Sequence, residues 1–157
     1  MKILFICTHN RCRSILAEAI TNHYGHGLIE SRSAGSSPAE QVHPLTLEAL
    51  RKAGIATNGL KSQSWDEFAD DTFDYVITVC DKAASEPCPL WFGKSRQVHW
   101  GLTDPSTING DPKTCDAAFQ KTIAILTQRI KQIIAWLAQG LDEEDLYQRM
   151  QALGDTA

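Results

Sequence analysis

Two residues that could bind and attack an oxyanion lie six positions apart near the start of the chain. Cys7 follows a short apolar run over residues 2–6, and Arg13 stands with Ser14 where a helical pattern begins. A cysteine thiolate is a strong nucleophile, and the planar guanidinium of arginine matches two oxygens of a phosphate-like anion. Unpaired N–H groups at a helix N-terminus favour both the anion and the thiolate. This segment therefore predicts a loop that binds a tetrahedral oxyanion and attacks it.

The residues between the cysteine and the helix are polar and would surround the bound anion. We expect the oxyanion to be bound by Thr8, His9, Asn10, Arg11, Cys12, Arg13 and Ser14. The alternative is that Cys7 is only a buried residue at a strand end, since free cysteine is among the most buried residue types. That alternative leaves Asn10, Arg13 and Ser14 without a role.

Three further candidates, Cys80, Cys88 and Asp104, lie far from this loop in the sequence. Cys80 and Asp104 each come at or just after a run that is typical of a strand. Ligands of parallel sheets bind at the carboxyl ends of the strands, so Cys7, Cys80 and Asp104 are expected at one edge. Cys80 and Cys88 together form a pair of thiols that can supply two electrons.

Alternating strands and helices must position these residues. Strands are predicted at residues 2–6, 28–33, 74–80 and 97–102, and helices at residues 14–24, 44–53, 63–68, 111–139 and 143–153. Residues 81–93 are expected to form a long irregular connection. The alternation favours an α/β fold with a central four-stranded parallel sheet, in a single three-layer domain over residues 1–157. Its oxyanion loop would join the first strand to the first helix, and a short extra helix would occupy about 141–154.

The composition is that of an ordinary globular protein. A formal net charge of -4 argues against nucleic-acid partners and offers no basic tail for a membrane surface. No apolar run approaches the roughly 20 residues of a membrane span, and no signal peptide is expected. The five cysteines are an odd number, and two of them flank the reactive loop, so we expect a reducing cytoplasm rather than a secreted disulfide framework.

The pattern Cys7-x5-Arg13-Ser14 resembles the low-molecular-weight protein tyrosine phosphatase superfamily, and specifically its arsenate reductases. The resemblance extends over most of the chain, through Ser33-Ala34-Gly35, Val79-Cys80 and His99-Trp100-Gly101 to Asp104-Pro105. It implies that Cys7 is the nucleophile, that Arg13 clamps the oxyanion, and that Asp104 is the general acid for the leaving group.

Two features favour reduction over hydrolysis within this resemblance. Tyrosine phosphatases place aromatic residues just after the Asp-Pro pair, whereas Ser106-Thr107-Ile108 stands here and offers no ring to stack on an aryl phosphate. A small inorganic oxyanion such as arsenate or phosphate needs no such ring. Reduction of arsenate to arsenite consumes two electrons, and Cys80 with Cys88 can supply them.

The resemblance implies a relay of three thiols. Cys7 attacks arsenate, Cys80 then attacks Cys7 and releases arsenite, and Cys88 attacks Cys80 and regenerates Cys7. Eight residue steps span about 26 Å as a strand and about 12 Å as a helix, whereas a disulfide needs Cα atoms within about 7 Å. The segment before Cys88 must therefore fold back, and we expect it to be mobile and partly helical. Thioredoxin or glutathione with glutaredoxin would be the external reductant, with no tightly bound cofactor.

A potassium site is not expected. Asn10, Glu18 and Ser33 match potassium-binding members of the superfamily, but residues 61–64 contain no aspartate that could complete the ligand set.

Two other functions remain as alternatives. The first is a low-molecular-weight phosphatase that hydrolyses phosphate monoesters. The second is a non-catalytic zinc or redox-sensing module built from Cys7, Cys12, Cys80 and Cys88. Their spacings fit structural zinc poorly, and Asp104 would have no role in such a module.

Overall fold

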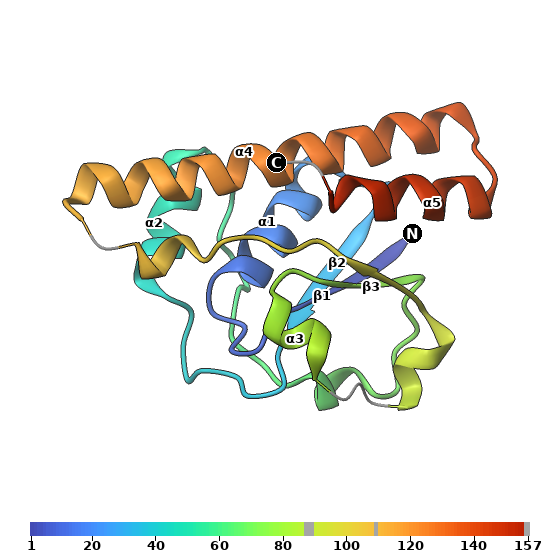
Figure 1. Ribbon diagram of the computed structural model, residues 1–157, viewed down its shortest axis with the longest axis horizontal. Coiled ribbons are helices and arrows are strands. Elements are labelled where there is room, and N and C mark those ends of the chain that lie inside the picture. Colours follow the sequence, from blue (N-terminus) through green and yellow to red (C-terminus); the bar gives the residue numbers. More distant parts are fainter. Residues whose placement is uncertain (87–89, 109, 156–157) are drawn as a thin grey trace.

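A parallel sheet of four strands forms the centre of the molecule (Figure 1). The computed structural model describes residues 1–86, 90–108 and 110–155. The strands are β1 (Lys2–Ile6), β2 (Glu30–Ala34), β3 (Tyr75–Thr78) and β4 (Arg96–His99), in the order β2-β1-β3-β4. Ile6 of β1 is in register with Ala34 of β2 and with Thr78 of β3. The predicted α/β fold with a four-stranded parallel sheet is confirmed, as is the loop between the first strand and the first helix.

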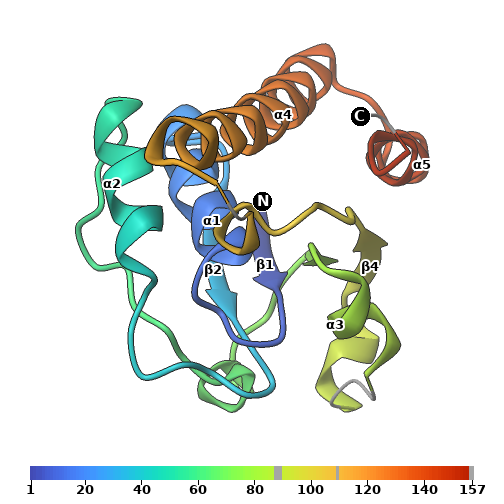
Figure 2. The same cartoon turned by 60° about the vertical axis from the view of Figure 1, so that its left-hand side comes forward.

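Helices pack around this sheet. The α-helices are α1 (Arg13–Tyr24), α2 (Pro44–Lys52), α3 (Asp81–Ser85), α4 (Pro112–Gln139) and α5 (Glu143–Leu153), and short 3-10 helices lie at η1 (Trp65–Phe68), η2 (Leu90–Lys94) and η3 (Pro105–Thr107). Helix α1 packs on β1 and β2, and the long α4 packs on α1. Helix α5 folds back beside α4 and contacts β4 (Figure 2). No helix among the described residues is long and apolar enough to cross a membrane.

The inner strand β1 is buried along almost its whole length. Ile3, Leu4, Phe5 and Ile6 are each at most 1% exposed, as expected for a parallel strand covered on both faces. Trp100, just beyond β4, is also fully buried, and its ring lies 6.2 Å from that of Phe5. The Trp100 indole N–H donates to the Met150 carbonyl at 2.8 Å, which ties α5 to the sheet.

The long helix α4 buries one stripe of its surface, which shifts by one residue near the end of the helix. The Asp111 side chain accepts from the Thr114 N–H at the start of α4, and Gly140 ends the helix with a φ of 70°. Apolar residues spaced by alternating steps of four and three, Phe119, Ile123, Leu126, Ile130 and Ile133, are buried. Leu137 is only half-buried, and Trp136 is buried instead. A period of 3.6 residues drifts relative to alternating steps of four and three, which moves the buried stripe by the last turn.

The first strand ends at Ile6 as predicted, but the predicted ends of the other three strands were wrong by one to three residues, and this matters for the site. Strand β3 ends at Thr78 and β4 at His99, so Cys80 and Asp104 lie beyond the strands. Both are N-caps, Cys80 of α3 and Asp104 of η3, because each side chain accepts an N–H from the turn that follows. Residues 81–93, predicted to be irregular, contain α3 and η2.

Candidate active site

The loop between β1 and α1 presents its carbonyl oxygens to the neighbouring segment. The N–H groups of Ser37, Ala39 and His43 donate to the carbonyls of Thr8, His9 and Arg11 at 2.9, 2.9 and 3.0 Å. The loop's own N–H groups, over residues 8–14, donate to no acceptor among the residues described. These donors are therefore available to a bound anion, as at other helix N-termini that bind phosphate.

Gly35 allows the turn after β2 to lie directly against this loop. A Cβ atom at Gly35 would lie 2.5 Å from the Thr8 carbonyl oxygen and 2.6 Å from the Cys7 carbonyl oxygen. The Gly35 N–H donates to the Gln63 carbonyl at 3.0 Å, which holds a third segment against the same turn. Only glycine fits here without moving the nucleophile's own backbone.

Asn10 fixes the shape of the loop from inside. Its φ of 46° lies in the left-handed region, which asparagine adopts more readily than most residues. The fully buried side chain donates from Nδ2 to Ser14 Oγ at 2.8 Å and to Ser33 Oγ at 2.9 Å. Its Oδ1 accepts from the Gln63 N–H at 2.8 Å. All its hydrogen-bonding groups except one lone pair are thus used to hold the loop.

The Ser14 hydroxyl contacts the proposed nucleophile. The Cys7 sulfur lies 2.9 Å from Ser14 Oγ and is 4% exposed. Because Ser14 Oγ already accepts from Asn10, its own hydroxyl proton is free to point at the Cys7 sulfur. A hydroxyl at this distance can donate to the sulfur of an attacking cysteine.

Cys12 has the opposite environment. It is 2% exposed at the start of α1, and burial raises the pKa of its thiol to about 12, against a smaller lowering by the Thr46 hydrogen bond. Cys12 is therefore a protonated thiol at neutral pH. It contributes to the loop through its backbone and packing, in keeping with its place outside the relay.

Arg13 and Asp104 meet across the site. Arg13 Nη1 donates to the Leu102 carbonyl at 2.9 Å, and Nη2 lies 3.7 Å from Asp104 Oδ2. The buried Arg13 Nε has no hydrogen-bond partner among the described residues. A buried donor without a partner costs free energy, and an oxyanion in the loop is a suitable acceptor for it. The guanidinium thus links the predicted anion site to the predicted general acid.

Asp104 is an ionised carboxylate in this arrangement. Partial burial by itself raises its pKa, but two hydrogen bonds from Ser106 and the nearby Arg13 guanidinium outweigh burial, so the pKa lies below its ordinary value. Those bonds run from the Ser106 N–H at 2.9 Å and the Ser106 hydroxyl at 2.6 Å. A general acid at this position must therefore gain a proton before it can give one.

Cys80 lies beside the loop, as predicted. The Val79 N–H donates to the Ile6 carbonyl at 2.9 Å, which continues the pairing of β1 with β3 up to the residues that precede Cys7 and Cys80. The Cys80 sulfur lies 3.9 Å from Thr8 Oγ1 and accepts from the Ala83 N–H at 3.4 Å. Cys88, the third predicted thiol, lies outside the described residues.

Sequence reasoning missed Glu86, which contacts the loop. Glu86, the C-cap of α3, accepts from the Thr8 hydroxyl at 2.8 Å and from the Ser36 hydroxyl. A single glutamate in a polar connection carries no signal of its own in the sequence. His9 and Arg11 were predicted to bind the oxyanion. Their carbonyls accept from the Ala39 and His43 N–H groups of the neighbouring segment. The His9 ring is exposed and forms a hydrogen bond with the Ser37 carbonyl.

The structure also brings together the three residues considered for potassium. Asn10 donates to Ser33, whose hydroxyl donates to Glu18 Oε1 at 2.6 Å. Burial raises the pKa of Glu18, and the Ser33 hydrogen bond opposes that change. These groups satisfy one another. Across residues 1–86, 90–108 and 110–155, no group of three histidine, cysteine or acidic side chains is placed to hold a metal ion.

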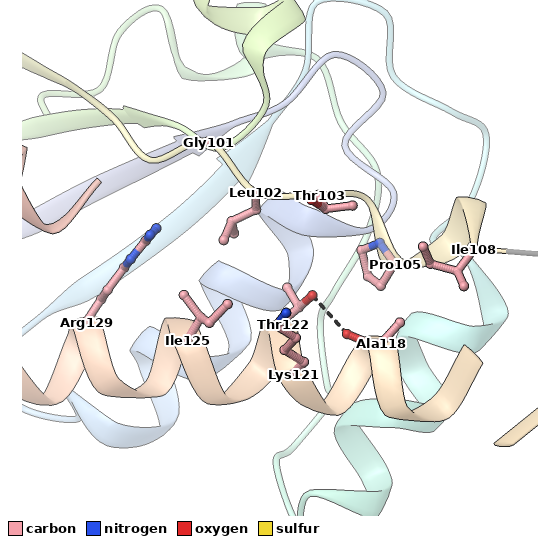
Figure 3. A pocket seen from close by; sticks show the side chains of 10 residues that line it. All are labelled: Gly101, Leu102, Thr103, Pro105, Ile108, Ala118, Lys121, Thr122, Ile125 and Arg129. Carbon is pink, nitrogen blue, oxygen red and sulfur yellow. Dashed lines mark hydrogen bonds between the residues drawn. The ribbon is translucent and has the colours of Figure 1, made fainter. Parts of the chain in front are cut away.

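A cavity of about 440 Å³ lies behind the Asp104 segment, between residues 101–108 and α4 (Figure 3). It is lined by Gly101, Leu102, Thr103, Pro105, Ile108, Ala118, Lys121, Thr122, Ile125 and Arg129. The Thr122 hydroxyl turns back to the Ala118 carbonyl of its own helix. Cys7, Arg13, Cys80 and Asp104 do not line this cavity, so the candidate chemistry belongs to the loop and not to it.

Comparisons with known proteins identify relatives over most of the chain. An arsenate reductase of Shouchella clausii is 32% identical over 130 residues, which cover 83% of this chain and 92% of the relative. A glutaredoxin arsenate reductase of Synechocystis is 33% identical over 104 residues, covering 66% and 78%. The structure of a thioredoxin-dependent arsenate reductase of Corynebacterium glutamicum superposes with a TM-score of 0.67 at 28% identity. That match covers 89% of this chain and 63% of that protein.

The family assignment rests on a longer match. Residues 2–145 match the model of the low molecular weight phosphotyrosine protein phosphatase family. This range contains the whole sheet, the oxyanion loop, Cys80 and the Asp104 segment. The chain therefore belongs to the low molecular weight phosphotyrosine protein phosphatase family.

Proposed function

We propose that this protein is an arsenate reductase that converts arsenate to arsenite through a cysteine nucleophile and a thiol–disulfide relay. The observation that carries the proposal is the second thiol at the oxyanion loop, with the Cys80 sulfur 3.9 Å from the hydroxyl of Thr8, which directly follows Cys7. Hydrolysis of a phosphate ester needs only one thiol, whereas a two-electron reduction needs two. The relatives named arsenate reductase support the same reaction.

In the first step, the loop N–H groups and Arg13 would hold arsenate while the Cys7 thiolate attacks arsenic. One As–O bond breaks as the S–As bond forms, and the departing oxygen leaves as water. Asp104 would deliver a proton to that oxygen as general acid. Because its carboxylate is ionised in the free protein, Asp104 brings no proton of its own. Arsenate would therefore react as its dihydrogen form, which carries both protons of the departing water, and Asp104 would pass one of them to the leaving oxygen.

In the second step, the Cys80 thiolate would attack the Cys7 sulfur. The Cys7–Cys80 S–S bond forms as the S–As bond breaks, and the electron pair of that bond stays on arsenic. Arsenic(V) thereby becomes arsenic(III), arsenite leaves, and two thiols have been oxidised to one disulfide. No additional oxidant or reductant is required for this turnover.

In the third step, Cys88 would attack Cys80, so that Cys7 is regenerated and a Cys80–Cys88 disulfide remains. An external thiol protein would reduce that disulfide. We propose a donor of the thioredoxin or glutaredoxin class, in keeping with relatives named for each. The separate activities of the two donors with the purified protein would distinguish them.

A disulfide-mapping experiment tests the relay. The reduced protein receives one equivalent of arsenate without reductant and is then alkylated, digested and analysed by mass spectrometry. We expect a Cys80–Cys88 disulfide in the wild type and a Cys7–Cys80 disulfide in Cys88→Ser. Phosphate, which is not reduced, should produce neither. The proposal fails if arsenate leaves all cysteines of the wild type alkylated.

Phosphatase activity is a second candidate, favoured by the pairing of Arg13 with Asp104 beside Cys7. The same loop would hold a phosphate ester, and Asp104 would protonate its leaving group. The three residues after Asp104-Pro105 include no aromatic ring, and Ser106 donates to the Asp104 carboxylate. We therefore expect weak hydrolysis of aryl phosphates, measured against the rate of arsenate reduction. A turnover of aryl phosphate that exceeds arsenate reduction would reverse the order of the two candidates.

A further inference from the structure

Glu86 receives two hydroxyl protons at the edge of the oxyanion loop. The Thr8 hydroxyl donates to Oε1 at 2.8 Å, and the Ser36 hydroxyl donates to Oε2. Both carboxyl oxygens act as acceptors in these contacts, so the loop itself holds Glu86 in position.

The donor count at Thr8 determines the direction of its contact with Cys80. A threonine hydroxyl has a single proton, and that of Thr8 is used on Glu86. Toward the Cys80 sulfur, 3.9 Å away, Thr8 Oγ1 can therefore only accept, so the Cys80 S–H donates to it. A continuous chain results, from the Cys80 thiol through the Thr8 hydroxyl to the Glu86 carboxylate.

Burial limits the other routes by which the Cys80 thiol could lose its proton. Cys80 is 2% exposed and Thr8 is 6% exposed, so bulk water has little access to the thiol proton. Cys80 must nevertheless become a thiolate before it can attack Cys7. Two described groups form hydrogen bonds with its sulfur. The Ala83 N–H is a donor, so among the described residues Thr8 is the acceptor through which the proton can depart.

We infer that Glu86 takes up the proton of Cys80 through the Thr8 hydroxyl and so activates the second thiol; the inference rests on the proposed reductase function. The Cys80 proton moves to Thr8 Oγ1 as the Thr8 proton moves to Glu86 Oε1. Charge passes from carboxylate to sulfur, and no electrons are transferred. The Thr8 O–H and the Ala83 N–H then both donate to the Cys80 thiolate. Glu86 acts through Thr8 and is a positioning residue.

The first test isolates the Cys80 step in a Cys88→Ser background, where arsenate should stop the reaction at the Cys7–Cys80 disulfide. Its rate is followed by quenching and mass spectrometry in the parent, in Glu86→Gln, and in the control Glu40→Gln, which changes an exposed carboxylate. Glutamine keeps both contacts, because its amide oxygen accepts from Thr8 and its amide nitrogen can donate to Ser36. We expect disulfide formation to slow by about 100-fold in Glu86→Gln, the lower end of the usual range for general base catalysis, and to change less than about twofold in Glu40→Gln.

The outcomes separate this inference from the function on which it rests. A parent that forms no disulfide contradicts the reductase function. A parent that forms it at the same rate as Glu86→Gln contradicts the proton path alone, because an anchoring role would survive the glutamine substitution.

Variants at Thr8 provide a second and independent test. Thr8→Ser keeps the hydroxyl and should keep the rate of disulfide formation, whereas Thr8→Val removes the hydroxyl and should slow it as Glu86→Gln does. In the double variant Thr8→Val with Glu86→Gln, the two losses should not multiply, since either one interrupts the same path. Losses that multiply in the double variant would overturn the inference. Equal rates in Thr8→Ser and Thr8→Val would also overturn it, even if Glu86→Gln failed to fold.

Discussion

At the residue scale, the two thiols of the oxyanion loop have different surroundings. The Ser14 hydroxyl accepts from Asn10 and lies 2.9 Å from the Cys7 sulfur, so its proton can point at that sulfur. Cys12 lies five residues later in the same segment. Burial raises the pKa of its thiol to about 12, because the hydrogen bond with Thr46 lowers that pKa by less than burial raises it. The two thiols are almost equally buried, so what distinguishes them is the hydrogen bonds around each sulfur.

The contrast predicts that Cys12→Ala leaves the relay intact. We expect arsenate-dependent disulfide formation within about threefold of the wild-type rate, because a thiol with a pKa of about 12 is almost wholly protonated at neutral pH. Cys115→Ala, at a half-buried position on α4, is the matched control. A loss of disulfide formation in Cys12→Ala alone, in a folded protein, would place Cys12 in the relay.

Replacement of Asp104 by Asn should separate binding from chemistry. The variant loses the general acid, and the first step should slow by about 10²- to 10⁴-fold. Phosphate affinity should stay equal or increase, because the carboxylate that competes for Arg13 has lost its charge. Single-turnover kinetics and phosphate titration measure the two effects, with exposed Asp70→Asn as control. A parallel loss of affinity would indicate that Asp104 acts by holding Arg13.

At the element scale, the oxyanion loop is held in shape by contacts with neighbouring segments. The turn after β2 contacts it at Gly35, the segment after it supplies three N–H donors, and residue Gln63 reaches both Gly35 and Asn10. The anion site is therefore built by β1, β2 and their following loops together. This explains how the loop can keep its N–H groups without partners in the protein.

Gly35→Ala tests this packing. The added methyl would overlap the Thr8 and Cys7 carbonyls, so we expect the free energy of unfolding to fall by about 1–3 kcal/mol and phosphate affinity to weaken as the loop shifts. Gly93→Ala is the matched control, because a Cβ there meets no atom within 4 Å. Chemical denaturation and phosphate titration give the two values. Equal stability of the two variants would contradict the close approach.

Glu18 on α1 predicts a pH-dependent effect on stability. Burial raises its pKa above the ordinary 4.5, so the unfolded chain releases this proton at a lower pH than the folded protein does. As pH rises from 4.5 through the folded pKa, the wild type should therefore lose stability relative to Glu18→Gln. The loss is about 1.4 kcal/mol for each tenfold difference in proton affinity between the folded and unfolded states. Below pH 4.5 the difference in stability between the two proteins should be constant.

Urea unfolding of both proteins across this pH range provides the measurement. Glutamine can still accept from Ser33, so the comparison isolates the charge. A difference in unfolding free energy that does not change with pH would show that Glu18 keeps its ordinary pKa in the fold.

At the scale of the whole molecule, one edge of the parallel sheet collects residues from three distant parts of the chain. The first strand delivers Cys7, the neighbouring β3 leads to Cys80, and the segment after β4 leads to Asp104. Helix α5, through the Trp100–Met150 hydrogen bond, holds β4 and thereby the origin of the Asp104 segment. The adjacency of β1 and β3 brings the two thiols to the same loop.

Much of this arrangement could be predicted from the sequence, because hydrophobic periodicity and the cysteine–arginine spacing are local signals. Strand order was not, since it depends on pairing between distant segments. The N-caps at Cys80 and Asp104 were missed because strand propensity does not show where a side chain accepts a hydrogen bond from a backbone N–H group. Glu86 was invisible for a similar reason: its partners Thr8 and Ser36 lie 78 and 50 positions away.

The arsenite yield of a single turnover tests the central claim most directly. Reduced protein is mixed with excess arsenate in the absence of any other thiol, and arsenite is measured by chromatography with arsenic detection. The relay predicts one arsenite for each wild-type chain and for each Cys88→Ser chain, and none for Cys7→Ser or Cys80→Ser. A full equivalent of arsenite from Cys80→Ser would contradict the account.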